Sequence, residues 1–232
     1  NLISSFKLIK GGKFKFGERV DYPTNTSAST PFSFDFSNSS YTNNQLTQIN
    51  SFWIGKYEVT QAEWKNIMNY NNSEIKGNNL PVTNITWLEA IQFCNKLSIK
   101  NNLDPVYSVI LNEVQIKENA NGFRLPTAQE WEYAAKGGQK SKGYYFSGSN
   151  EVDKVAWWQN NTTGQIQNVG QKKANELGLY DMSGNVIEWC YTSKSDLPLQ
   201  SGEIHVASSS QRKITKGGSY RTYESRLTPW SE

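Results

Sequence analysis

Three side chains that carry oxygen ligands lie close together in the last third of the chain. Asp181, Asn185 and Glu188 fall within residues 181–188, and the glycines of the same stretch permit sharp backbone turns. A tight loop rich in carboxylate, amide and main-chain oxygens suits a hard cation such as calcium. The alternative is an Asx-type turn that satisfies its own backbone. The spacing by itself favours the turn, and the rest of the chain reverses that preference.

Few residues are available for other chemistry. The chain has one histidine, His205, and two cysteines, Cys94 and Cys190, whose separation gives no zinc-ligand spacing. Two cysteines are also too few for a disulfide scaffold. A single histidine in a polar, serine-rich stretch leaves little scope for a catalytic triad, and we assign His205 no role.

Composition excludes some classes of partner. The 232 residues include 24 Lys+Arg and 21 Asp+Glu, a net charge of +3, and the basic residues are scattered along the sequence. A nucleic-acid groove needs a concentrated basic stripe instead. No apolar run approaches the roughly 20 residues that span a bilayer. We therefore expect one domain, residues 1–232, with no nucleic-acid partner and no transmembrane segment.

One repeated device predicts three helices. The Thr-x-x-Glu spacing of a capping box occurs at Thr60, Thr86 and Thr127, so a helix should begin at each threonine. In the second helix, Cys94 shares one face with three large apolar residues and is therefore interpreted as a packing residue.

The remaining segments are typical of short strands and long loops. Apolar/Lys alternation on both sides of Gly11-Gly12 predicts a hairpin within residues 6–17. Strand-like runs occur at 144–146, 155–158 and 214–220. Residues 20–50 and 99–121 are polar and are interpreted as insertions, the second with an exposed hairpin at 106–111. This pattern indicates a compact α+β domain whose loops hold the function.

Several motifs occur in an order that resembles one family. They include Gly-Phe-Arg-Leu-Pro-Thr at 122–127, Gly-Leu-Tyr-Asp at 178–181, Gly-Asn-Val-Ile-Glu-Trp at 184–189 and Gly-Gly-Ser-Tyr at 217–220. Residues 7–17, 56–61 and 81–87 add to the series. Together they resemble the formylglycine-generating enzyme (sulfatase-modifying factor) family over nearly the whole chain.

The resemblance implies a fold and a metal loop. The fold would be an elaborated variant of the C-type lectin fold with little regular secondary structure. Residues 178–189 would form a structural calcium site whose ligands are the side chains of Asp181 and Glu188 and main-chain oxygens of Gly184 and Val186. Asn185 would brace this loop. The family's second calcium site would lie near 155–167, where acidic residues are lacking, and we do not expect it to be kept.

The resemblance also locates the chemistry of the family. Its oxidases hold copper with a cysteine pair just after the Gly-Gly-Ser-aromatic strand, and soft thiolates are what Cu(I) requires. The corresponding positions in this chain are Thr222 and Leu227, and Cys94 and Cys190 lie in other segments. We therefore expect no copper and no enzymatic activity of this kind.

The C-terminal segment, residues 220–230, carries residue types that are common on adaptable recognition surfaces, namely rigid aromatics, arginines and small hydroxyls. Here the chain resembles the variable proteins of diversity-generating retroelements, which place ligand-binding residues on this part of the same fold. The candidate ligand-binding residues are Tyr220, Arg221, Thr222, Tyr223, Glu224, Arg226, Leu227 and Trp230. The alternative is an ordinary surface strand and loop.

Two functions follow from these patterns. The first is a non-catalytic, receptor- or adhesin-like protein on the bacterial cell surface, lipid-anchored or secreted and monomeric, that captures a macromolecular ligand such as a protein. The second is a formylglycine-generating oxidase that acts on a sulfatase cysteine with an unfamiliar active site. A third possibility, an accessory module of a larger assembly, predicts neither activity nor strong capture.

Overall fold

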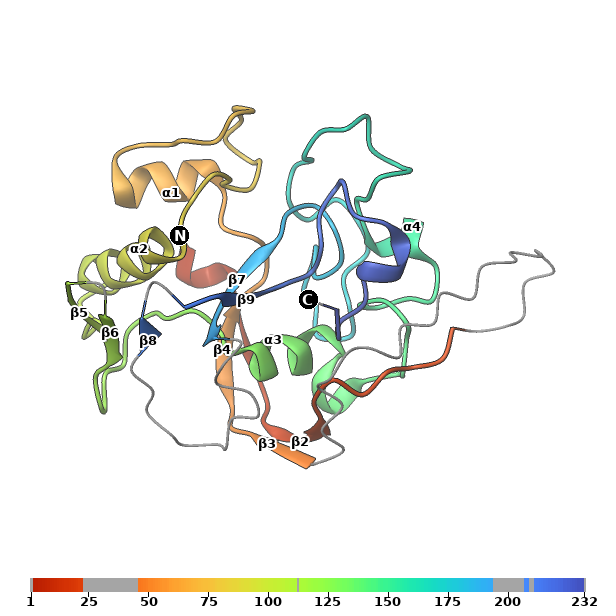
Figure 1. Ribbon diagram of the computed structural model, residues 1–232, viewed down its shortest axis with the longest axis horizontal. Coiled ribbons are helices and arrows are strands. Elements are labelled where there is room, and N and C mark those ends of the chain that lie inside the picture. Colours follow the sequence, from red (N-terminus) through yellow and green to blue (C-terminus); the bar gives the residue numbers. More distant parts are fainter. Residues whose placement is uncertain (1, 23–45, 112, 194–206, 209–210, 232) are drawn as a thin grey trace.

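The computed structural model describes residues 2–22, 46–111, 113–193, 207–208 and 211–231. Figure 1 shows short helices and strands joined by long loops. The described strands form four small sheets, in the orders β1-β4, β2-β3, β5-β6-β8 and β7-β9, and every pairing is antiparallel. In chain order the elements are η1 (Leu2–Ser5), β1 (Phe6–Ile9), β2 (Gly12–Lys15), β3 (Leu46–Ile49), β4 (Phe52–Gly55), α1 (Gln61–Met68), α2 (Trp87–Lys100), β5 (Tyr107–Ile110), β6 (Glu113–Ile116), α3 (Ala128–Ala135), η2 (Gly138–Lys140), α4 (Val152–Val155), β7 (Glu188–Ser193), β8 (Ala207–Ser208), β9 (Lys213–Lys216) and η4 (Glu224–Arg226).

The first two strands form a long ribbon with residues 46–55. β1 pairs with β4 and β2 pairs with β3, so that Ile9 lies opposite Phe52 and Gly12 lies opposite Ile49. The predicted hairpin at Gly11-Gly12 is therefore wrong, because the chain continues through both glycines and finds its partners further along the sequence. A Cβ on Gly11 would lie 2.3 Å from the carbonyl oxygen of Ile49, and this close approach requires glycine.

The ribbon also changes the interpretation of residues 20–50 as an insertion. β3 (Leu46–Ile49) lies inside that range but is hydrogen-bonded to β2, so the end of the range belongs to the framework. Residues 23–45 lie outside the described residues.

The three predicted capping boxes are all present. The side chains of Thr60, Thr86 and Thr127 each accept a hydrogen bond from the backbone N–H three residues on, and the glutamate at that position accepts one from the threonine N–H. These boxes begin α1, α2 and α3. Cys94 is buried on the inner face of α2, as expected of a packing residue.

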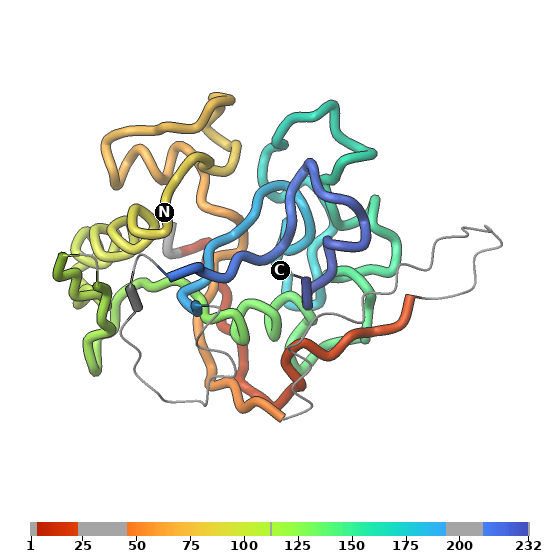
Figure 2. The backbone as a smooth tube through the Cα atoms, viewed as in Figure 1, coloured from red at the N-terminus to blue at the C-terminus, as the bar shows by residue number. Residues whose placement is uncertain are grey.

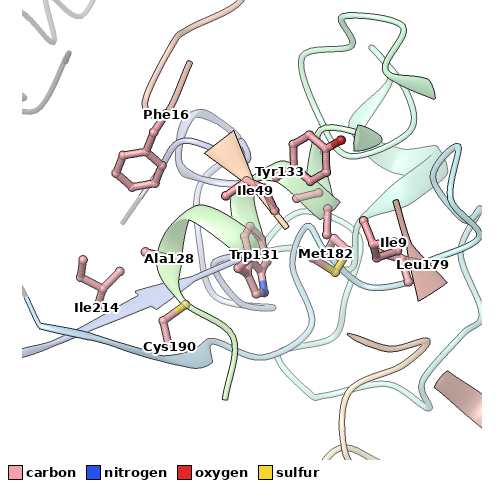
Figure 3. Close-up of a cluster of buried hydrophobic side chains, with 12 residues drawn as sticks. Ile9, Phe16, Ile49, Ala128, Trp131, Tyr133, Leu179, Met182, Cys190 and Ile214 are labelled. Carbon is pink, nitrogen blue, oxygen red and sulfur yellow. The ribbon is translucent and has the colours of Figure 1, made fainter. Parts of the chain in front are cut away.

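A large buried cluster surrounds α3, and Figure 3 shows its side chains. Trp131 of α3 packs there with Ile9 of β1 and Ile214 of β9. Leu179 and Met182 reach into the same cluster from the loop that contains Asp181. The core thereby anchors this loop immediately on both sides of its first acidic residue.

A buried carboxylate joins the C-terminal part of the chain to the core. Glu132 of α3 is fully buried and lies 3.3 Å from Lys216 Nζ and 2.7 Å from Lys136 Nζ, and it also accepts a hydrogen bond from Gly17 N at 2.7 Å. Lys216 Nζ in turn donates to Pro229 O at 3.4 Å. The end of the C-terminal segment is thus tied, through Lys216, to this buried charge.

Two predicted strands have other conformations. Residues 144–146 contribute only one bridge, from Phe146 to Ser149. Val155 ends the short helix α4, and Trp157 makes an isolated bridge to Gly184. The apolar runs at both places fill the core beneath irregular backbone, which a strand pattern cannot distinguish from a true strand.

Two other predictions are confirmed in part. β9 occupies the start of the predicted strand 214–220 and pairs with β7. The hairpin expected at 106–111 is formed by β5 and β6, although its inner side is not exposed as predicted. Val106, Tyr107 and Val114 pack there against buried residues of α2.

Candidate functional site

Backbone contacts with Trp157 and Gly217 hold the loop 178–189 in one conformation. Gly184 has a φ of 85°, and a Cβ there would lie 2.2 Å from the carbonyl oxygen of Trp157. Gly184 N donates to Gly217 O at 2.8 Å, and Asn185 N donates to Trp157 O at 2.8 Å. Asp181 (φ 57°) and Asn185 (φ 56°) are also left-handed, a conformation that Asp and Asn adopt more readily than other non-glycine residues.

Asn185 braces this loop, as the family resemblance implies. Its fully buried side chain donates from Nδ2 to Glu58 Oε2 at 2.6 Å and to Gln167 O at 3.2 Å. Its Oδ1 accepts a hydrogen bond from Gln167 N at 3.0 Å. Three segments of the chain therefore meet on one amide.

Glu58 is a buried carboxylate that contacts this loop, and this contact was not predicted from the sequence. Its Oε2 accepts from Asn185 Nδ2, and its Oε1 accepts from Val186 N at 3.0 Å. These partners lie 127 and 128 positions away along the chain, so local spacing could not reveal the contact. One signal was present, since Glu58 lies in 56–61, a stretch that carries the family resemblance.

Three carboxylates lie within electrostatic reach of one another: Glu58 and Asp181, which are buried, and Glu188, which is half-buried. Burial raises the pKa of Asp181 to about 6, and burial together with the nearby charge of Asp181 raises the pKa of Glu188 to about 7. The pKa of Glu58 is raised well above its ordinary value, first by burial and then by repulsion from Asp181 and Glu188. Within the described ranges no basic side chain contributes to these shifts. The loop therefore needs protons or a cation to balance its charge.

The oxygen atoms of this loop fit a hard cation. Asp181 Oδ2 accepts from Gly170 N at 2.6 Å, whereas its buried Oδ1 has no hydrogen-bond partner among the described residues. Glu188 Oε2 accepts from Trp131 Nε1 at 3.1 Å. In the part of the chain that the structure describes, no three His, Cys, Asp or Glu side chains gather into a metal site. A cation here would therefore need main-chain oxygens, which the family resemblance places at Gly184 and Val186.

The C-terminal segment begins directly on this loop. Tyr220 N donates to Asn185 O at 2.8 Å, immediately after Gly217 and Gly218 turn the chain out of β9 with positive φ angles. A tight turn follows, in which Ser219 N donates to Thr222 Oγ1 at 2.8 Å and Thr222 N donates to Ser219 O at 2.9 Å. The conformation of the acidic loop thus sets where the segment starts.

Three predicted binding residues face solvent. Arg221, Tyr223 and Arg226 are exposed, and 68% of the surface of Tyr223 is accessible. Neither guanidinium forms an ion pair with another described residue, and that of Arg221 lies 5.0 Å from the Tyr220 ring centre. Exposed aromatic area and unpaired guanidinium donors are the groups that dominate protein recognition.

Three other predicted binding residues have partners within the protein. Leu227 is fully buried beside Phe146 and Trp158, so the prediction that it contacts a ligand is wrong. Its side chain is turned inward after the short helix η4. Trp230 packs edge-on against Tyr145 at 5.2 Å between ring centres, and Glu224 Oε1 accepts from Tyr22 OH at 3.2 Å. These contacts fix the inner side of the segment.

Thr222 and Leu227, where the resemblance places the thiolates, both lie against Gly218. A Cβ on Gly218 would lie 3.3 Å from Thr222 Cγ2 and 2.8 Å from Leu227 Cδ2. A hydroxyl bonded to Ser219 and a buried isobutyl group therefore occupy the place of a thiolate pair, and these groups do not fit copper.

The two cysteines lie elsewhere. Cys94 and Cys190 are buried and belong to two different clusters of the core. Burial raises the pKa of the Cys94 thiol to about 12. Neither cysteine replaces the thiolates missing at Thr222 and Leu227.

A second loop borders the C-terminal segment and was not predicted to be part of the recognition surface. Thr162 Oγ1 donates to Tyr220 O at 3.3 Å, and Gln159 N donates to Thr222 O at 3.5 Å. In Figure 1 the teal loop and the blue segment lie together at the top of the view. Gln159, Asn160, Thr163 and Gln165 of this loop are exposed. We call the outward residues of 220–226 together with 159–165 the recognition face.

Comparison with known families identifies the class of protein. The chain matches the model of the sulfatase-modifying factor enzyme 1-like domain over residues 3–232, and it belongs to this family. The α+β fold expected from the sequence, a C-type lectin fold of the formylglycine-generating type, is confirmed.

The names of individual relatives describe different roles. The chain is 47% identical over 190 residues to Chaperone protein LppX of Paenibacillus barcinonensis, with 68% of each chain covered. It is 34% identical over 95 residues to Inactive C-alpha-formylglycine-generating enzyme 2 of Bos taurus, covering 37% of this chain and 32% of that one. Among solved structures it resembles Treponema denticola variable protein 1 with a TM-score of 0.75 and 28% identity, covering 97% of this chain and 87% of that chain.

The length and hydropathy of a helix decide whether it could span a membrane. No helix among the described residues is both long and apolar enough to cross a bilayer.

Proposed function

We propose that this chain is a non-catalytic binding protein that captures a macromolecular ligand on its recognition face. Arg221, Tyr223 and Arg226 would make the main contacts, and the amide and hydroxyl groups of 159–165 would supply adaptable hydrogen bonds at the side. The inner residues Leu227 and Trp230 would hold the segment in place without touching the ligand.

One observation carries this proposal. The two positions around Gly218 that hold the redox metal in the family's oxidases are filled by Thr222 and Leu227, neither of which ligates copper. The neighbouring Arg221, Tyr223 and Arg226 are instead exposed, and neither guanidinium forms an ion pair with another described residue. The chain is not an enzyme of the copper oxidase type. The exposed side chains at this site instead form a surface that a ligand could contact.

Three of the relatives support the same conclusion. One is named a chaperone, one an inactive enzyme and one a variable protein, and none of these names describes catalysis. The chaperone also supports a protein as the ligand and a bacterial, extracytoplasmic location, on a lipid anchor or in secreted form. We propose further that the chain acts as a monomer.

A structural calcium ion would stabilise the recognition face from below. Asp181 and Glu188 would bind it through their carboxylates and Gly184 and Val186 through main-chain oxygens, while Asn185 braces the loop. The buried, unpartnered Oδ1 of Asp181 and the uncompensated charge of this loop support the proposal. The ion would act through Asn185, whose carbonyl accepts the hydrogen bond from Tyr220 N.

The test compares two exposed surfaces of the same chain. The immobilised protein is incubated with secreted and envelope proteins of the source organism, and retained proteins are quantified by mass spectrometry. The variant Tyr223→Ala/Arg226→Ala should lose the proteins that wild type retains. The matched control Lys65→Ala/Lys96→Ala, which alters exposed lysines of α1 and α2, should retain them. Equal retention by both variants would refute the proposed face.

The alternative function has a separate test. An oxidase would convert the cysteine of a sulfatase-derived peptide to formylglycine, which mass spectrometry detects as an aldehyde. We expect no aldehyde from this protein, with or without added copper. Aldehyde that forms only in its presence would replace the binding proposal by the oxidase.

A further inference from the structure

The ribbon of β1, β2, β3 and β4 has an outward side that the proposed function does not use. Residues directly opposite in an antiparallel pair point to the same side. The register therefore places Leu8 with Trp53, and Lys13 with Gln48, on the side away from the buried core. All four of these side chains are exposed.

The ribbon carries charge of one sign. Residues 6–17 and 46–57 contain five lysines and no aspartate or glutamate, although the whole chain has a net charge of only +3. Lys7, Lys10 and Lys13 are exposed and form no ion pair with another described residue. Lys15 is paired with Glu18 at 3.1 Å and is thereby neutralised.

Large apolar side chains are exposed beside these lysines. Leu8 and Trp53 are cross-strand neighbours, and 51% and 64% of their surfaces are accessible. Large apolar side chains of a ribbon normally face the core, whereas this pair faces solvent. Tryptophan and leucine exposed next to free lysines are typical of surfaces that bind the interface of an anionic bilayer.

We propose that the outward side of this ribbon docks on a bilayer that contains anionic lipid. Lys10 and Lys13 would contact phosphate head groups, while Trp53 and Leu8 enter the interfacial layer. Charge complementarity alone would also suit a free polyanion, but a polyanion gives the Trp–Leu pair no apolar environment. The exposed apolar pair therefore favours the lipid surface.

The position of the ribbon is compatible with ligand capture. Figure 2 shows β2 and β3 at the bottom of the view, whereas the loop 159–165 and the start of the C-terminal segment lie at the top. Docking through the β2–β3 end of the ribbon would leave the recognition face open. The two surfaces are independent, and neither proposal requires the other.

Vesicle co-sedimentation tests this inference. The full chain is mixed with vesicles of phosphatidylcholine alone or with a quarter of phosphatidylglycerol, at about 0.1 M salt. Wild type should bind the anionic vesicles at least roughly tenfold more strongly, and salt at about 0.5 M should weaken the binding. Equal binding to both vesicle types, or none to either, would overturn the proposal.

Matched variants locate the contact. Lys10→Glu/Lys13→Glu should lower anionic-vesicle binding at least roughly tenfold, whereas Lys65→Glu/Lys96→Glu, with the same change in net charge, should have little effect. Equal losses in the two double variants would show only non-specific attraction and overturn the proposal. Thermal melting of each variant confirms that it is folded.

Trp53→Ser separates a bilayer from a free polyanion. Docking at the lipid interface predicts that this variant binds vesicles more weakly and loses the blue shift of tryptophan fluorescence that wild type shows. Inorganic polyphosphate serves as the lipid-free probe. If Trp53→Ser binds vesicles like wild type, and polyphosphate competes with vesicles for both proteins, the surface is a general anion site and the lipid proposal is wrong.

Discussion

The acidic loop 178–189 and the C-terminal segment 220–230 are joined by the hydrogen bond from Tyr220 N to Asn185 O, but they use their side chains in opposite ways. Asp181 and Asn185 are buried, and their side chains are held by partners from two other segments, at Glu58 and at 167–170. Tyr223 and Arg226 are exposed, and among the described residues Arg226 forms no ion pair. The loop determines where the segment lies, and the segment presents what a ligand could contact.

This contrast divides the site into framework and surface. A change to the framework should alter the free energy of unfolding, and a change to the surface should alter binding. The division does not follow chain order, since Leu227 lies in the segment but packs in the core.

The largest expected effect is at Leu227. Leu227→Ala would leave a cavity beside Phe146 and Trp158, and buried leucine-to-alanine changes cost about 2–5 kcal/mol. Urea unfolding followed by fluorescence measures the loss. A cost below about 0.5 kcal/mol would place Leu227 with the surface residues and break the division.

A second large effect concerns pH in the calcium-free protein. The folded-state pKa values of Asp181 and Glu188, about 6 and about 7, lie above the ordinary values of 3.8 and 4.5. Between about pH 4 and 7 the folded state therefore binds more protons than the unfolded state, so the free energy of unfolding falls as pH rises. The fall should be up to about 5 kcal/mol, about half of it from each group. Urea unfolding in a chelator at several pH values measures it.

Asp181→Asn supplies the control for this pH dependence. The variant removes one of the two groups, so its stability should change less between about pH 4 and 7 than that of wild type. A wild-type profile that is flat, or that rises with pH, would contradict the burial of unpaired carboxylates in this loop.

The third effect is on binding alone. Tyr223→Ala should weaken ligand binding by about 2 kcal/mol, roughly thirtyfold in Kd, as for a central aromatic contact. Its free energy of unfolding should stay within about 0.5 kcal/mol of wild type, because the ring is largely exposed. Trp53→Ala, which alters another exposed aromatic, is the matched control and should bind the ligand normally. A loss of stability comparable to the loss of binding would show that Tyr223 belongs to the framework.

The smallest effect is that of added calcium. Sites of extracellular type bind at roughly 10⁻⁴–10⁻³ M, so a few millimolar calcium should stabilise the fold by about 1–2 kcal/mol. The corresponding rise in Tm is roughly 2–8 °C. Asp181→Ala and Glu188→Ala should abolish this rise, and the exposed control Glu151→Ala should keep it. Chelator-treated wild type that shows no rise would exclude the proposed ion.

Local chemistry made much of the framework predictable. The capping boxes at Thr60, Thr86 and Thr127 depend only on residues three apart, and all three begin helices. The family motifs likewise identified the fold and the bracing role of Asn185. Each of these features is encoded by neighbouring residues or by motifs that keep their order.

Features that depend on distant packing were not predictable in the same way. The alternation around Gly11-Gly12 is the same for a hairpin and for two halves of a ribbon, and only the pairing with 46–55 decides between them. Glu58 joins the acidic loop through partners more than 120 residues away. Leu227 lies among Tyr, Arg and Ser residues, and its burial follows from the inward turn after η4.

Site-specific photo-cross-linking tests the recognition face most directly. A photoreactive phenylalanine at position 223, 226 or 160 should cross-link the same captured ligand, because these three positions share one face. The same group at position 53 or 65 should not cross-link it. Cross-links that arise equally from 53 or 65, or a position 223 that yields none while wild type still retains its ligand, would contradict the assignment of this face.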